Sequence, residues 1–138
     1  MAVCTGMSDD EKQVRETIER WVDAISACDL DGVIAAHTDD VVLFDVPPPH
    51  DGIRGIAGYR DSWPEFFEFI RSGAVLQLLE LDVTAGDDVA FARGLLRCGT
   101  PEDIAANPEN RLRTTIGLRK VDGRWMIAHE HHSFPMTG

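Results

Sequence analysis

The first third of the chain carries hydrophobic residues at a helical period. A capping box, residues 8–11 (SDDE), precedes a run whose apolar positions fall on one face of a helix. That stripe consists of Val14, Ile18, Trp21, Val22 and Ile25. We therefore predict a helix that ends at about residue 28. Residues 29–31 (DLD) open a short second helix to about residue 37, and residues 38–40 are expected to form a turn.

The middle of the chain changes from a strand pattern to a helical one. Residues 41–46 (VVLFDV) read as a buried strand, which the prolines at 47–49 end because they cannot donate ladder hydrogen bonds. After a loop at 50–55, residues 56–71 predict a third helix. Pro64 lies inside it, so a kink or a helix restart is expected there.

The second half is strand-like. Strands are predicted at residues 75–84, 89–98, 112–121 and 124–133, with turns at 86–88 and 122–123 and a polar loop at 100–110. Helices followed by a strand meander are typical of an α+β fold, with an antiparallel sheet and the helices on one face. We predict a single domain over 8–135 and a flexible N-terminal lead over 1–7, in which Met7 is an alternative start.

Net charge and cysteine content exclude several classes of partner and site. The formal net charge is −11, and the Lys and Arg residues form no basic stripe, which argues against nucleic acid and anionic membrane surfaces. Cys4, Cys28 and Cys98 are too few and too far apart for a disulfide framework or a zinc site. The first residues do not resemble a signal peptide, and no apolar run has membrane-spanning length. A cytoplasmic location is expected.

Asp45 is the first candidate for chemistry. A carboxylate inside an apolar strand has a raised pKa if it is buried without a partner, which suits a general acid or base. The alternative is an exposed aspartate on an edge strand or one that caps the proline turn.

The second candidate is the segment 129–132 (HEHH). In a strand, His129 and His131 share one face, while Glu130 and His132 share the other. These imidazoles could shuttle protons near neutral pH. A metal would need a further ligand that the sequence does not nominate, so no metal is predicted. Structural hydrogen bonds or an interface are the remaining alternatives.

Two further groups are candidate pocket residues. Tyr59, Trp63 and Phe66 lie along the predicted third helix, together with Phe67, and could form either core or pocket wall. Arg93 shares a strand face with Arg97, and an arginine there could clamp a carboxylate or lie at the surface.

Two stretches resemble a known family. Residues 21–31 (WVDAISACDLD) and 37–45 (HTDDVVLFD) look like the opening of ketosteroid isomerases and SnoaL-like proteins. Residues 118–133 (LRKVDGRWMIAHEHHS) are similar to the ending of SnoaL-like proteins and of the association domain of calcium/calmodulin-dependent kinase. All belong to the nuclear-transport-factor-like superfamily, and the resemblance covers about residues 11–135.

The resemblance implies a cone-shaped barrel, in which a curved, mostly antiparallel sheet packs against three helices from the N-terminal half. Asp45 falls where the isomerases place the aspartate that moves a proton beside a carbonyl. Glu130 and His132 fall at cavity-lining positions, and Arg93 falls where the kinase domain has a cavity arginine. The resemblance also implies a homodimer through the outer sheet face, on which His129, His131 and Trp125 are expected together.

The chain departs from the isomerases at their oxyanion donors. Trp21 stands at the position of their first-helix tyrosine, and residues 114–116 (TTI) lack their late-strand aspartic acid. Steroid isomerisation by that mechanism is therefore not expected, and His132, Arg93 or Tyr59 would have to replace the donors.

Two function hypotheses follow. In the first, Asp45 and His132 are catalytic in a cofactor-free isomerase, cyclase or dehydratase-like enzyme. Ligand-binding residues would be Trp21, Tyr59, Trp63, Phe66, Arg93 and Glu130. In the second, the chain is a non-catalytic ligand-binding or dimeric assembly domain. The expected partners are a small-molecule ligand or substrate and a second copy of the chain.

Overall fold

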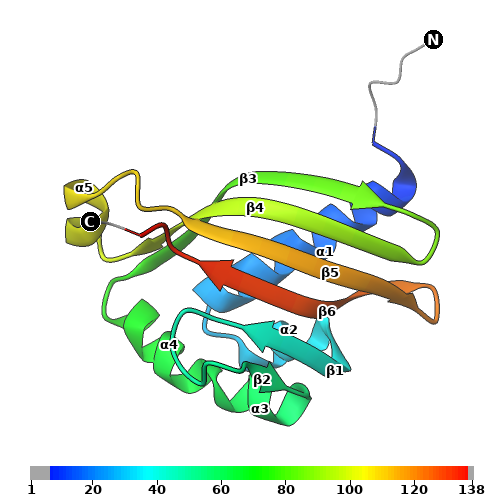
Figure 1. The fold of residues 1–138 in the computed structure, drawn as a ribbon, viewed down its shortest axis with the longest axis horizontal. Helices are drawn as coiled ribbons and strands as arrows, with labels where there is room; N and C mark the ends of the chain where they lie inside the picture. The colour runs from blue at the N-terminus through cyan, green and yellow to red at the C-terminus, as the bar shows by residue number, and fades with distance from the viewer. Residues whose placement is uncertain (1–6, 137–138) are drawn as a thin grey trace.

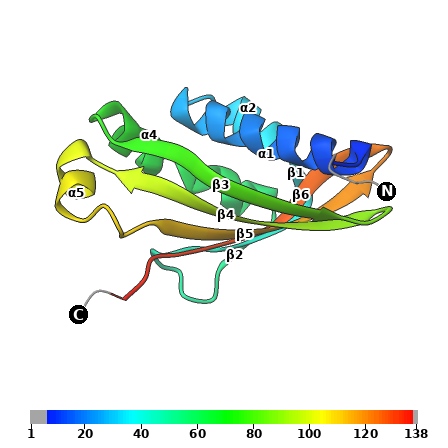
Figure 2. The same ribbon diagram turned by 90° about the horizontal axis from the view of Figure 1, so that it is seen from above.

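Six strands form one curved sheet in the order β2-β1-β6-β5-β4-β3, and helices cover one of its faces (Figures 1 and 2). The structure is a computed structural model, and it describes residues 7–136. The helices are α1 (Asp9–Ser26), α2 (Leu30–Ala35), α3 (Ile56–Asp61), α4 (Trp63–Arg71) and α5 (Pro101–Ala106). The strands are β1 (His37–Phe44), β2 (Ile53–Arg54), β3 (Val75–Ala85), β4 (Val89–Gly99), β5 (Leu112–Val121) and β6 (Arg124–Ser133).

The predicted α+β class is confirmed. Figure 2 shows α1, α2 and α4 on the same side of the sheet. All strand pairs are antiparallel except β1 with β6, which run parallel. The core lies between the helices and this face, where the α1 stripe meets alternate residues of β4, β5 and β6. Residues 1–6 of the predicted lead lie outside the described residues.

Helix α1 begins as predicted. The side chain of Ser8 accepts a hydrogen bond from the Glu11 N–H, and the Glu11 carboxylate accepts one from the Ser8 N–H. The helix restart at Pro64 is also confirmed. The predicted third helix is two helices, α3 and α4, which meet at Ser62, and Pro64 occupies the first turn of α4, where its missing N–H costs nothing.

The bounds of β1 and two short elements differ from the prediction. Strand β1 starts at His37 rather than at residue 41, so the expected turn at 38–40 is part of the strand. Strand β2 lies in the predicted loop 50–55. Helix α5 lies in the predicted loop 100–110, and the Thr100 side chain caps it by accepting from the Asp103 N–H.

A bulge in β6 decides which residues face the helices. Gly117 lies opposite His129, but Leu118 lies opposite Ile127, so Ala128 is the extra residue. The alternation of side chains between the two faces of β6 therefore shifts by one residue at the bulge. As a result, both Trp125 and Glu130 face the core and are buried. The expectation that Trp125 shares the outer face with His129 and His131 is wrong. The Trp125 indole instead donates to the carboxylate of Asp10 on α1.

The outer sheet face carries exposed apolar side chains, among them Val89 and Phe91 at 62% and 51% exposure. The homodimer through this face stays a prediction, which light scattering would test. None of the helices in residues 7–136 is long and apolar enough to cross a membrane.

Candidate functional site

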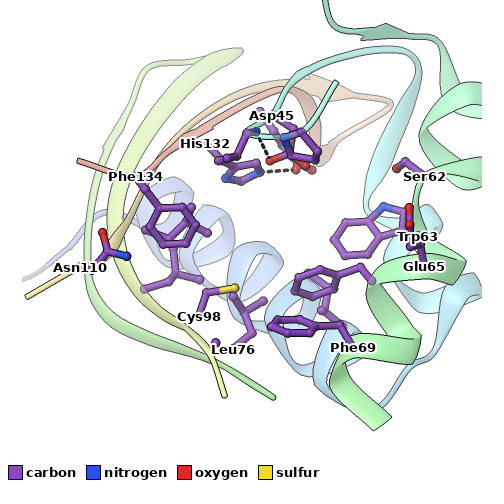
Figure 3. Close-up of a pocket in the computed structure, with 18 of the residues that line it drawn as sticks. Asp45, Ser62, Trp63, Glu65, Phe69, Leu76, Cys98, Asn110, His132 and Phe134 are labelled. Carbon is purple, nitrogen blue, oxygen red and sulfur yellow. Dashed lines mark hydrogen bonds and ion pairs between the residues drawn. The ribbon is translucent and has the colours of Figure 1, made fainter. Parts of the chain in front are cut away.

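A cavity of about 700 Å³ opens between α1, α4 and the concave face of the sheet (Figure 3). Its walls are mostly apolar, and five aromatic side chains contribute to them. These are Trp21, Trp63, Phe66, Phe69 and Phe134. Its polar lining includes Asp45, Glu130 and His132. Volume and composition are those of a small-molecule site.

Glu130 is the centre of a buried polar network at this cavity. The carboxylate has no solvent exposure, yet it holds three partners. Oε2 accepts from the Tyr59 hydroxyl at 2.6 Å and contacts Nε2 of His37, and Oε1 contacts Nε2 of His132 at 2.9 Å. The Trp21 indole N–H donates in turn to the Tyr59 oxygen at 3.1 Å. The network joins α1, α3, β1 and β6.

The partners fix the protons in this network. Nδ1 of His37 lies 2.8 Å from the carbonyl oxygen of Val33, which only accepts, so Nδ1 carries a proton. The Tyr59 oxygen accepts from Trp21, so its own proton goes to Glu130. Burial alone would raise the pKa of Glu130, but the charge of His37 and the hydrogen bonds from His132 and His37 lower it to about 2.

The same surroundings hold the proton on Tyr59. Burial first, and then the negative charge of Glu130, raise the pKa of the Tyr59 hydroxyl well above its usual range. Tyr59 is therefore a neutral donor to Glu130. Tyr59 was a candidate ligand-binding residue, but it lies behind the cavity wall and does not line the cavity. Its hydroxyl contacts Glu130 instead.

His132 lies where the network meets the cavity, and its ring stacks on Trp21 with 6.0 Å between ring centroids. Burial opposes the charging of the ring, but the hydrogen bond to Glu130 and the negative charges of Glu130 and Asp45 raise the pKa of His132. Because Nε2 donates to Glu130, Nδ1 is the atom that gains or loses a proton. Nδ1 is buried and has no hydrogen-bond partner within residues 7–136.

This pKa shift can be measured directly. NMR titration of His132 should give a pKa above that of a free histidine, and the Glu130→Gln variant should lower it because the anion is lost. The raised pKa means that the interaction stabilises the fold fully below the ordinary value of 6.5, and that this stabilisation is lost as the pH rises through the folded-state pKa. An unshifted His132 in the unmodified protein would contradict the network.

Asp45 is exposed, as the second of the two alternatives had it, and the buried carboxylate of the first alternative is not found. It follows the end of β1, is exposed, and accepts a hydrogen bond from the Val46 N–H at 2.8 Å. It also lines the cavity, and Figure 3 shows it close to His132 on the same wall. The carboxylate is thus a solvated group at the cavity mouth, placed beside the buried network.

The other candidates divide between cavity and surface. Trp21, Trp63 and Phe66 line the cavity, as Glu130 and His132 do. Arg93 does not, and its predicted cavity position is wrong. It points from the outer face of β4 and forms an exposed ion pair with Asp82 at 2.6 Å. Successive residues of a strand point to opposite faces, and Ala92 faces the core. Arg93 therefore points to the outer face.

His37 and Cys98 were not among the site residues predicted from the sequence. His37 sat at the predicted end of a helix, and only the folded structure places it beside Glu130. Cys98 lines the cavity, where burial first and the charge of Asp45 second raise the pKa of its thiol to about 11. It is therefore a protonated, unreactive thiol. Within residues 7–136, no group of three His, Cys, Asp or Glu side chains is placed to hold a metal ion.

Comparison with known proteins supports this architecture. A model of the SnoaL-like domain matches residues 14–137. The chain belongs to the SnoaL-like family. An NTF2-like protein of unknown function from Pseudomonas putida KT2440 is 35% identical, with a TM-score of 0.82, over 96% of this chain and 92% of that one.

More distant structures share the fold of this SnoaL-like protein. One is an NTF2-like protein with a cystatin-like fold from Novosphingobium aromaticivorans, at 16% identity and TM-score 0.73, covering 94% of this chain and 84% of that one. Another is a protein proposed to be a ketosteroid isomerase from Shewanella frigidimarina, at 19% identity and TM-score 0.71, covering 86% and 92%. The comparison with curated proteins gave no match.

Proposed function

We propose that this SnoaL-like protein is a cofactor-free enzyme that moves a proton on a small, mainly apolar molecule with a carbonyl group. The observation that carries the proposal is the shared cavity wall of Asp45 and His132, with Glu130 anchoring His132 from behind. Paired groups of opposite protonation state beside an apolar cavity are what proton transfer next to a carbonyl requires.

The hydrogen bonds already made in the network decide which donor can serve the substrate oxygen. The N–H of Trp21 is used by Tyr59, and the hydroxyl proton of Tyr59 is used by Glu130. Neither is free for a substrate. Nδ1 of His132 has no partner within the described chain, so it is the available donor. Thr115 lies on the exposed outer face and cannot contribute.

The proposed step balances without a further reactant. The Asp45 carboxylate takes a proton from the carbon next to the carbonyl, and the electron pair of that C–H bond forms the enol double bond. The carbonyl oxygen takes the proton from Nδ1 of His132. Glu130 stabilises the imidazolium before the transfer and keeps the ring oriented after it. In a conjugated substrate, Asp45 returns its proton to another carbon of the dienol while the enol O–H returns its proton to Nδ1 of His132, which gives the isomer and restores both residues.

Hydrogen exchange tests this proposal without knowledge of the natural substrate. Apolar one- and two-ring ketones would be incubated with the protein in D₂O, and deuterium incorporation beside the carbonyl followed by NMR. We expect incorporation above the buffer rate for ketones that also raise the melting temperature. Ketones that bind without any accelerated exchange would contradict catalysis and favour the non-catalytic ligand-binding domain.

A further inference from the structure

The charged side chains around the cavity that have no charged partner are of one sign. Asp45, Glu65 and Asp103 all line it, and its lining contains no lysine or arginine. None of these three acids forms an ion pair with another residue of the described chain. Their charges therefore remain available to a ligand. The charges of Glu130 and His132, by contrast, are engaged with each other and with His37.

One of the acids is on the helix that carries the aromatic wall. Glu65 is an exposed residue of α4, between Trp63 and Phe66 in the sequence, and it lies on a different wall from Asp45 in Figure 3. The rings of Trp63 and Phe66 meet edge to face with 5.6 Å between their centroids. The ring of Phe69 packs against that of Phe66 with 5.8 Å between centroids. Aromatic faces beside a carboxylate attract a cation through the ring quadrupole and the negative charge together.

The wall also contains an indole N–H without a well-formed hydrogen bond. Trp63 lines the cavity and is only 9% exposed; its N–H is buried, lies toward the Tyr59 oxygen and makes no hydrogen bond of good geometry within residues 7–136. The Tyr59 oxygen already accepts from Trp21. Trp63 therefore contributes its ring to the cavity wall and no free donor.

We infer that the cavity binds an apolar molecule carrying a basic amine, and that it discriminates against carboxylates and phosphates. The inference rests on the proposed function, because it names the class of molecule that occupies the same site. The apolar body lies against the α4 aromatic rings, the ammonium group lies near Glu65, and the oxygen function lies toward Asp45 and His132. An acid would place its negative charge among three unpaired carboxylates.

Calorimetric titration with three probes of one skeleton tests this inference: naphthylethylamine, naphthylethanol and naphthylacetate, at low ionic strength. The amine should bind about tenfold more tightly than the alcohol, as a partly exposed ion pair and a cation–π contact together allow. The acetate should bind most weakly. Raising the salt concentration should reduce the preference for the amine.

Matched variants locate the effect. Glu65→Gln should remove several-fold of the amine preference and leave the affinity for the alcohol unchanged. Glu68→Gln is the control, because Glu68 is exposed on the same helix and does not line the cavity. The inference is overturned if the amine does not bind, if the alcohol or acetate binds as tightly, or if the control variant has the same effect. Because binding is read without turnover, this failure is separable from failure of the exchange assay.

Discussion

Replacing Glu130 by alanine is expected to lower the free energy of unfolding by about 3–5 kcal/mol, the usual cost of removing one partner from a buried ion pair. The variant leaves the ring of His37, the hydroxyl of Tyr59 and Nε2 of His132 without their acceptor in a buried region. Urea denaturation measures the change. Glu68→Ala is the control, since an exposed substitution is expected to change stability by less than about 0.5 kcal/mol.

A conservative variant separates the charge from the packing. Glu130→Gln keeps the volume and one acceptor oxygen but loses the anion, so it should be destabilised less than the alanine variant and remain folded. A loss below about 1 kcal/mol in Glu130→Ala would contradict the network.

The loss of stability at acid pH should reflect protonation of the Glu130 carboxylate. The pKa of Glu130 is lowered from 4.5 to about 2 in the folded state, so its stabilisation is present above 4.5 and is lost as the pH falls toward 2. The difference corresponds to about 3 kcal/mol, at roughly 1.4 kcal/mol per pH unit. The Glu130→Gln variant should lose less stability between pH 5 and 2 than the unmodified protein.

The second large effect concerns His132. His132→Gln should lower the proton-transfer rate by about 10²–10⁴, the usual contribution of a positioned acid or base, because glutamine cannot pass on a proton. His131→Gln is a matched control, since His131 is the next residue of β6 and is exposed on the outer face.

The pH profile distinguishes catalysis from folding. The limb that reflects protonation of His132 should disappear in His132→Gln, while a merely destabilised protein would keep that limb. Equal rates in His132→Gln and His131→Gln would remove His132 from the mechanism.

The local patterns predicted most of the fold because each depended on neighbouring residues. The capping box at Ser8, the α1 stripe and the restart at Pro64 are signals within a few positions of the feature they specify. Helix α5 was missed although its signal was present, a threonine followed by a proline and two acidic residues. The polar composition of that segment suggested a loop instead.

The site was less predictable because it depends on register and on distant contacts. The bulge at Ala128 puts Trp125 and Glu130 on the same face, and strict alternation could not foresee it. His37 and Glu130 are 93 positions apart, and nothing local marks their contact. The family position assigned Arg93 to the cavity, but in this chain the residue pairs with Asp82 on the outer surface.

The exchange rate of the Asp45→Asn variant tests the central claim most directly. It would be measured with a ketone whose deuterium incorporation the unmodified protein accelerates, beside Asp51→Asn, which changes an exposed acid that does not line the cavity. If Asp45 removes the proton, incorporation with Asp45→Asn falls to near the buffer rate, while the ketone still binds and Asp51→Asn keeps full activity. Incorporation by Asp45→Asn at the rate of the unmodified protein would contradict the account.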